Sequence, residues 1–494
     1  MFSSPRIVSK RIDLATVKKR AIVGIASLTI RRIALQAITF ISINLILARI
    51  YPPETGIIGI FNLGNAIIAF FAFFSDIGLA ASIIQKKEDV THEDLKTTFT
   101  IQQILVGILT LIIFFGAPTV ASYYKLDLAG VWLIRALGLA FFLTSLKVIP
   151  SVLLERELRF QPLVGVEIAE TAIFNIILLS LAFLNFGLYS FTFAALARSL
   201  SGTIMLYLIA PWRIGVGISR KAARGLLSFG IPYQVNALLA LLKDRIVPLF
   251  VAKVVGTVGL SYITWAQAIA FLPLEVMNII IRVTFPAYSR LQDNKEELKV
   301  AIEKSLFATT LFLYPALFGL LALAHSLVTQ VVSTKWQPAL PSLYLFSFST
   351  FWASISTTFT NVFNATGHIK LTLKLMIFWT ILTWVLTPPL TIFFGFNGVA
   401  IASALISFSS IITIYLMRRV VPVNLLGSIW QPLAVSAAMG FFVFVFARLF
   451  VVNIVTLLIA IIFGAVIYFA MMFLLAKEKL IVELKRVLHA IQKS

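Results

Sequence analysis

Basic residues inside long apolar segments are the side chains of this sequence best suited to bind something. An arginine near the centre of a membrane-spanning helix costs about 2.5–3.5 kcal/mol on insertion scales, and it usually faces the interior of a helix bundle or a wet cavity. A set of such residues therefore predicts a cationic cavity that binds an anion. The candidates for contact with this anion are Arg31, Arg32, Arg135, Arg198, Lys243 and Arg245.

Acidic residues in the same segments offer a competing explanation, a set of buried ion pairs. Of the charged residues that we assign to the membrane rather than to loops, five are acids and nine are bases, so that a positive excess is expected. Lys147, Arg282 and Lys304 lie near cytoplasmic helix ends, where we expect them to reach the interface as anchors, and Arg135 near an outer end fits an anchor equally well. The acids, with a role in ion pairing or in coupling to an ion, are Asp76, Glu167, Glu170, Asp244 and Glu275.

The adjacent pair Arg31 and Arg32 cannot point in one direction, because neighbouring residues of a helix differ by about 100°. Arg32 shares a face with Gln36 and Thr39, so we expect Arg32 in the cavity and Arg31 paired with a carboxylate. The same reasoning separates Lys243 from Arg245.

Polar stripes on further helices point to the same cavity. Such stripes also arise from hydrogen bonding between helices, and for the last of them alone that explanation is the better one. Together they favour a shared aqueous cleft. The stripes are Asn62, Asn65 and Asp76; Glu167, Glu170 and Thr171; Glu275, Asn278 and Arg282; and Ser347, Thr350, Ser354, Thr357 and Asn361.

The composition is that of a polytopic membrane protein. The 494 residues are 60% hydrophobic and only 12% charged, against roughly 25% charged in soluble domains. The net charge of +21 is explained by basic loops that fix topology, without nucleic acid. The absence of cysteine excludes disulfides and thiolate chemistry, and the four histidines are scattered. We expect no enzyme, cofactor or metal site, no ATP-binding motif, and no cleavable signal at the N-terminus.

Fourteen apolar segments are long enough to cross a bilayer as helices, for which about 20 residues suffice. The distribution of Lys and Arg residues tests this number of spans. Of the 41 residues, 27 fall in loops and tails on one side of the membrane, 5 fall in loops on the other side, and 9 lie inside spans or at their ends. This bias places both termini in the cytoplasm of a plasma (inner) membrane protein. The predicted spans are 21–50, 57–83, 97–120, 130–150, 162–184, 187–210, 226–252, 258–285, 300–324, 340–365, 371–394, 397–417, 430–450 and 453–476.

The second half of the chain repeats the first in parallel orientation. Ala48-Arg49 before Gly56 resembles Ala252-Lys253 before Gly259, and Gly187 opens a span as Gly398 does. The predicted fold is all-α, with two six-helix bundles plus two C-terminal helices around a central cavity. The predicted domains are a basic tail (1–20), two lobes (21–212 and 226–419) joined by a linker (213–225), two additional helices (430–476) and an amphipathic cytoplasmic tail (477–494).

Several motifs along the chain resemble those of Wzx-type polysaccharide flippases, which belong to the multidrug/oligosaccharidyl-lipid/polysaccharide exporter superfamily. The segments LARIYPPETG (47–56) and SDIGLAASIIQKKE (75–88) carry the resemblance. Arg159-Phe160, SFGIP (228–232) and Phe285-Pro286 match further landmarks in order. The resemblance implies twelve core helices in two lobes, often with two more, around a V-shaped cavity.

The resemblance also implies a substrate, an oligosaccharide linked by pyrophosphate to a polyprenyl lipid and moved from the cytoplasmic to the outer leaflet. Guanidinium groups bind pyrophosphate oxygens bidentately, so the basic residues fit this substrate. The product would serve surface polysaccharide synthesis: O-antigen, capsule or exopolysaccharide. Expected partners are the lipid-linked oligosaccharide, membrane lipids, H⁺ or Na⁺ as coupling ion, and the polysaccharide polymerase and glycosyltransferases.

Three alternatives stay open. A drug exporter of the same superfamily is disfavoured by the basic excess. A peptidoglycan-precursor flippase shares the cationic cavity but not the loop motifs. A membrane-bound glycosyltransferase or polymerase of lipid-linked sugars needs sizeable extramembrane loops, and the loops here are short.

Overall fold

The computed structural model describes residues 35–492 except 76, 86–89, 157–158 and 228–246. Its described secondary structure is helical, as predicted, and ten helices in this part are long and apolar enough to cross a membrane. The predicted number of fourteen spans is not confirmed by this count. Six candidate site residues lie outside the described residues: Arg31, Arg32, Asp76, Lys243, Asp244 and Arg245.

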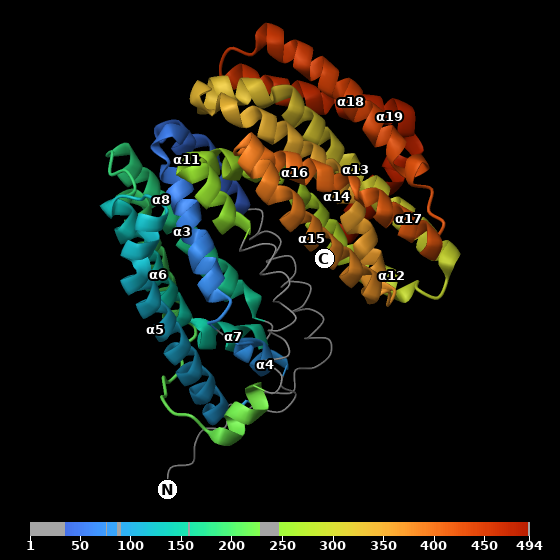
Figure 1. Cartoon of the computed structure of the whole chain (residues 1–494). Coiled ribbons are helices and arrows are strands. Elements are labelled where there is room, and N and C mark those ends of the chain that lie inside the picture. The colour runs from blue at the N-terminus through green and yellow to red at the C-terminus, as the bar shows by residue number, and fades with distance from the viewer. Residues whose placement is uncertain (1–34, 76, 86–89, 157–158, 228–246, 493–494) are drawn as a thin grey trace. The chain divides into compact units, whose positions relative to one another are not determined.

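The chain divides into two compact units, whose helices are labelled in Figure 1. The first unit comprises residues 1–51 and 57–257, and the second comprises 52–56 and 258–494. The predicted limits of the lobes, linker and tails stay predictions.

The first unit is a bundle in which α8 packs on α9, α9 on α6, and α6 on α5 and α3. Capping residues in the sequence fix where two of these helices begin. A capping box between Thr91 and Asp94 begins α5, and Asp127 caps α6 by accepting from the N–H of Gly130. The helices after the π-helical turn Phe40–Leu47 and α2 (Ala48–Ile50) are α3 (Ile57–Ala72), α4 (Leu79–Gln85), α5 (His92–Tyr123), α6 (Leu128–Ser145), α7 (Val148–Arg156), α8 (Phe160–Phe183) and α9 (Tyr189–Ile209).

Two spans predicted as single helices are broken in this unit. The span 57–83 divides into α3 and α4, with Ile77 and Gly78 at positive φ between them. The span 130–150 divides into α6 and α7 at Ser145–Val148. A helix break leaves backbone carbonyls without partners, which costs several kcal/mol each in a membrane.

Hydroxyl groups of α9 donate hydrogen bonds to two carbonyls at the α6–α7 break. Thr203 Oγ1 donates to the Leu143 carbonyl at 2.9 Å, and the Tyr207 hydroxyl donates to the Leu146 carbonyl at 2.9 Å. Because Thr203 and Tyr207 are four residues apart, they lie on one face of α9. Side chains of the neighbouring helix α9 therefore stabilise the break.

The predicted linker lies along the start of α5. The backbone N–H groups of Gly217 and Ser219 donate to the hydroxyls of Thr100 and Thr97 at 2.9 and 3.0 Å. Trp212 packs edge-on against Phe99. The linker therefore belongs to the surface of the first unit.

The second unit contains the remaining helices. The described helix α11 has a kink at Gly256, where φ is 69°, and its residues from Val258 onward belong to this unit. The helices, besides α11 (Val247–Ala270), are α12 (Leu274–Arg290), α13 (Lys295–Ser326), α14 (Leu340–Ala365), α15 (Ile369–Phe394), α16 (Asn397–Phe408), α17 (Ser410–Val420), α18 (Leu425–Phe450) and α19 (Ile454–Gln492).

The predicted span 258–285 is also broken, between α11 and α12. Thr350 of α14 satisfies the freed backbone by donating to the Ala270 carbonyl at 3.1 Å. Ser347, Thr350 and Ser354 are buried and bond to main-chain oxygens. Thr350 therefore makes the hydrogen bond between helices that was predicted for this stripe, whereas Ser347 and Ser354 donate to carbonyls of α14 itself.

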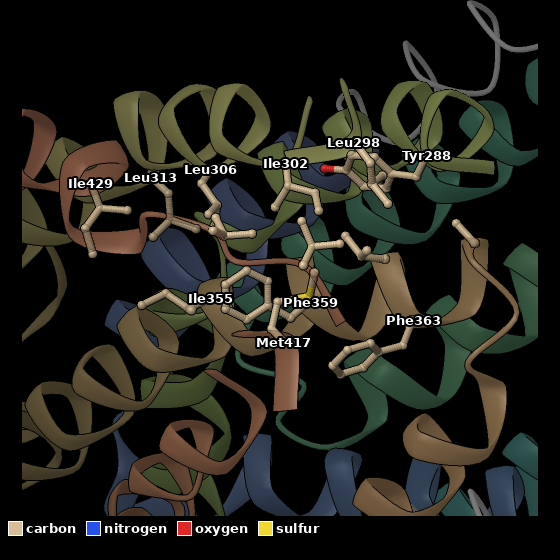
Figure 2. Packing of buried hydrophobic residues seen from close by; sticks show 14 of the residues in the cluster. Tyr288, Leu298, Ile302, Leu306, Leu313, Ile355, Phe359, Phe363, Met417 and Ile429 are labelled. Carbon is tan, nitrogen blue, oxygen red and sulfur yellow. The ribbon is translucent and has the colours of Figure 1, made fainter. Parts of the chain in front are cut away.

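A hydrophobic cluster, shown in Figure 2, holds α12, α13, α14, α17 and α18 together. Tyr288, Ile302, Phe359 and Met417 are nearly or fully buried in it. Lipid tails are as apolar as these side chains, so close packing rather than exclusion from water stabilises the cluster.

Candidate functional site

Arg198 is the described residue that best fits contact with an anion. It lies in the middle of α9 and its side chain is exposed. Within the described part of the chain, no acidic side chain lies within ion-pair distance of it. Its guanidinium carbon lies 5.8 Å from the ring centre of Phe174 on α8. The guanidinium is therefore available to a ligand.

The direction of Arg198 separates it from the lipid-facing side of α9. Phe193, Leu200 and Ile204 form an apolar stripe along this helix, each about half exposed. Arg198 lies five positions after Phe193. At 100° per residue, its side chain therefore points about 140° away from that of Phe193 around the helix axis. A charge at this depth is costly in lipid, so this orientation favours a wet cavity.

Aromatic rings support the guanidinium. Phe174 stacks on Phe61 of α3 with ring centres 6.0 Å apart, and Phe61 stacks on Phe191 of α9 at 4.1 Å. The attraction between a guanidinium and a ring face helps to fix the orientation of Arg198.

Arg135 has a different environment. It lies two turns into α6, on the exposed stripe formed by Leu128, Trp132 and Leu139. Its Nε donates to the Phe114 carbonyl at 3.2 Å, and its guanidinium carbon lies 4.6 and 5.2 Å from the ring centres of Phe114 and Trp132. These contacts favour an anchor at the membrane boundary over contact with the anion.

Glu170 forms an ion pair with Lys147. The side chain of Glu170 on α8 is 5% exposed, and that of Lys147, in the break between α6 and α7, is 15% exposed. The expectation that Lys147 acts as an interfacial anchor is not met, because its ammonium group points to α8. The buried-ion-pair explanation thus holds for this acid.

Further polar side chains are buried in the first unit. Ser145 donates to Gln103 Oε1 at 3.1 Å, and Thr171 and Ser199 are buried. Gln103 Nε2 and Asn175 Oδ1 are buried without a hydrogen-bond partner among the described residues. The part of the polar stripe formed by Glu170 and Thr171 therefore faces the interior of this unit, and the shared-cleft explanation is not needed for these two residues.

Gly202 of α9 makes room for the Glu170 carboxylate. A Cβ atom at position 202 would lie 1.4 Å from Glu170 Oε1. We expect Gly202→Ala to displace the carboxylate from Lys147 and to lower the melting temperature of the purified protein. Gly165→Ala on α8, where an added Cβ meets nothing within 4 Å, is the control. An unchanged melting temperature for Gly202→Ala would contradict this packing.

Two further acidic candidates lie among the described residues, and their side chains are half-buried. Glu167 and Glu275 both interact with neighbouring groups. In the described ranges no group of three or more His, Asp or Glu residues is arranged to hold a metal ion. The structure therefore brings together Lys147 with Glu170, while Arg135 and Arg198 contact different helices.

The sequence did not single out the residues that contact Arg198, make room for Glu170 or bond to the α6–α7 break. Gly202, Thr203 and Tyr207 follow Arg198 on α9 within about three turns, and Phe174 lies on another helix. A glycine in mid-span was a usable signal, since glycine there permits close helix approach. Which side chain fills that space depends on the packing.

Comparison with known proteins gives a family match and a fold match. Residues 46–341 match the family described as "Polysaccharide biosynthesis protein". The chain is 26% identical to the lipopolysaccharide biosynthesis protein WzxC of Escherichia coli K12 over 66% of each chain. It is 26% identical to the succinoglycan biosynthesis transport protein ExoT of Rhizobium meliloti 1021 over 62% of this chain and 61% of ExoT. The chain thus spans no more than about two thirds of these relatives.

Among solved structures, the lipid II flippase MurJ in an inward closed conformation has a similar fold. The TM-score is 0.72 at 14% sequence identity, covering 92% of this chain and 99% of MurJ. At this identity the likeness concerns the fold alone.

Proposed function

We propose that this multi-pass membrane protein, which belongs to the family of polysaccharide biosynthesis proteins, is a flippase for lipid-linked oligosaccharides. It would move a polyprenyl-pyrophosphate-linked oligosaccharide from the cytoplasmic to the outer leaflet of the plasma membrane. The product would serve the synthesis of a surface polysaccharide. WzxC and ExoT, whose names concern lipopolysaccharide and succinoglycan, are consistent with this substrate class.

The observation that carries the proposal is Arg198. It is an exposed guanidinium in mid-span, turned away from the apolar stripe of its helix and supported by Phe174. A pyrophosphate is the part of the substrate least compatible with hydrocarbon, and a guanidinium offers it a bidentate partner. Arg31, Arg32, Lys243 and Arg245 would provide further steps along the path of the anion.

Transport would occur by alternating access, with one lobe rocking against the other around the bound headgroup. Both termini would lie in the cytoplasm, following the bias of basic residues. Coupling to H⁺ or Na⁺ would rest on the carboxylates within the predicted spans, Asp76, Glu167, Glu170, Asp244 and Glu275. The polysaccharide polymerase and glycosyltransferases of the same pathway are the proposed protein partners.

A leaflet-accessibility assay tests the function. In cells depleted of this protein and lacking a second flippase, we expect lipid-linked oligosaccharide to accumulate on the cytoplasmic side, protected from a membrane-impermeant oxidant added outside. Re-expression should restore its exposure. Normal outer exposure in the depleted cells would reject the proposal, and accumulation of a peptidoglycan precursor instead would favour the alternative flippase.

A further inference from the structure

Three exposed aliphatic side chains lie on the predicted linker, shortly after the end of α9. Residues 211–219 form neither a helix nor a turn, and the three aliphatic residues occupy alternate positions in this stretch. The exposed fractions of Ile214, Val216 and Ile218 are 58%, 76% and 54%. Neighbouring apolar side chains that stay exposed in this way usually mark an interaction surface.

The opposite side of the same stretch is fastened to α5. The backbone N–H groups of Gly217 and Ser219 donate to threonine hydroxyls of α5, and Figure 1 shows this green segment beside the first turns of that helix. Gly215 also faces α5, since a Cβ atom there would lie 2.3 Å from Lys96 Cε. The odd-numbered residues are therefore held against the first unit, which leaves the even-numbered aliphatic residues exposed.

Basic residues flank the aliphatic ones. Arg213 precedes them, and Arg220, Lys221 and Arg224 follow in a helix at residues 220–227. All four side chains are exposed, and in the described part of the chain no acidic side chain forms an ion pair with any of them. Residues 211–224 contain no acid at all. The stretch therefore presents an apolar strip between unpaired positive charges.

The position of the stretch in the first unit places it at the boundary of the membrane. Thr97 and Thr100, which accept its hydrogen bonds, lie in the first turn of the predicted span 97–120. The exposed apolar stripe of α9 leads to the same place, because it continues through Leu208, which is 77% exposed, and α9 ends one residue later. Trp212 follows, and tryptophan is enriched at membrane interfaces. In the predicted topology this boundary is the cytoplasmic one.

We propose that residues 211–224 bind anionic phospholipids of the cytoplasmic leaflet. Ile214, Val216 and Ile218 enter the region where the acyl chains begin, and the four basic residues contact the phosphates of several headgroups. Apolar side chains combined with flanking basic residues are typical of segments that lie in an anionic interface. A layer of headgroups fits this surface because its charges are exposed and spread along the chain. The inference concerns the first unit alone and does not depend on the proposed function.

Fluorescence from the full-length protein in phospholipid nanodiscs tests this site. Because the chain contains no cysteine, one cysteine can be introduced at a time and labelled with the polarity-sensitive fluorophore NBD. The variants are Ile214→Cys, Val216→Cys and Ile218→Cys. Asp293→Cys is the reference, because Asp293 is exposed in the loop between α12 and α13.

In nanodiscs made of equal parts of phosphatidylcholine and phosphatidylglycerol, we expect the three linker labels to emit at shorter wavelength than the reference label. Lipids with a nitroxide near the top of the acyl chain should quench them, and aqueous iodide should quench only the reference. If iodide reaches the label of Val216→Cys, water covers the segment. If neither quencher reaches it, protein covers the segment. Either result would overturn the proposal.

Neutral variants test the contribution of the charges. We expect Arg213→Gln/Arg220→Gln/Lys221→Gln/Arg224→Gln to move the emission of the Val216→Cys label at least halfway towards that of the reference, because the attraction to the headgroups is lost. Nanodiscs of phosphatidylcholine alone should have the same effect on the original charges. The control replaces four exposed basic residues of the second unit by glutamine and should change nothing: Arg290, Lys295, Lys370 and Lys374.

Two outcomes would reject an anionic phospholipid as the ligand. The first is an emission of the Val216→Cys label that responds neither to the four substitutions nor to the charge of the lipid. The second is an emission that phosphatidylglycerol does not shift and that polyprenyl phosphate, added to phosphatidylcholine nanodiscs, does shift. That second outcome would assign the surface to the carrier lipid.

Discussion

Arg198→Ala is expected to abolish export while the protein still inserts and folds. The variant removes a guanidinium that is exposed on α9 and contacts Phe174 only through its ring face, so little packing is lost. Two charge-assisted hydrogen bonds to a pyrophosphate are worth about 1.5–3 kcal/mol each. Since 1.4 kcal/mol is a factor of ten, the rate of export at limiting substrate should fall by roughly 100-fold or more.

The measurement is the outer-leaflet exposure of lipid-linked oligosaccharide in a depleted strain that expresses each variant at equal level. Arg198→Lys should retain part of the export, because lysine keeps the charge and loses the bidentate fork. Arg135→Ala is the matched control, since its contacts with Phe114 and Trp132 favour an anchor. Full export by Arg198→Ala, or equal loss in both alanine variants, would contradict the assignment of Arg198.

Breaking the Lys147–Glu170 pair is expected to cause the largest loss of stability. Removing one partner of a buried ion pair costs about 3–5 kcal/mol, because the other charge stays buried. At roughly 2–4 °C per kcal/mol for a unit of this size, the melting temperature of Lys147→Met or Glu170→Gln should fall by about 10 °C. Differential scanning fluorimetry of the purified variants measures this effect.

The double variant Lys147→Met/Glu170→Gln separates structure from ion coupling. Replacing both charges removes the unpaired group, and such replacements are often neutral or stabilising. We therefore expect the double variant to regain both its melting temperature and its export activity. A double variant that is stable but inactive would instead assign Glu170 to ion coupling.

The sequence by itself determined the class of the protein and much of its helix pattern. Runs of apolar residues with few charges predicted helices that end within a few residues of α8, α9, α14 and α15, because burial of the backbone in lipid requires helices. The motifs at 47–56 and 75–88 indicated the family, and residues 46–341 match it. Arg198 was singled out because a charge in mid-span is costly wherever it occurs.

The partners of these residues were decided only by the tertiary structure. Periodicity assigns a side chain to a face of its helix, but not the helix that packs there. The sequence therefore could not pair Glu170 with Lys147, predict that Gly202 accommodates the carboxylate, or show that Thr203 and Tyr207 satisfy the broken helix.

The breaks themselves illustrate the same limit. The segments 57–83, 130–150 and 258–285 are each long and mainly apolar, so that hydropathy predicts one continuous span for each. At the breaks in the latter two, carbonyl oxygens accept hydrogen bonds from hydroxyls that lie on α9 and α14, outside the broken segments. Such contacts depend on distances between elements far apart in the chain, and these distances are fixed only when the helices pack.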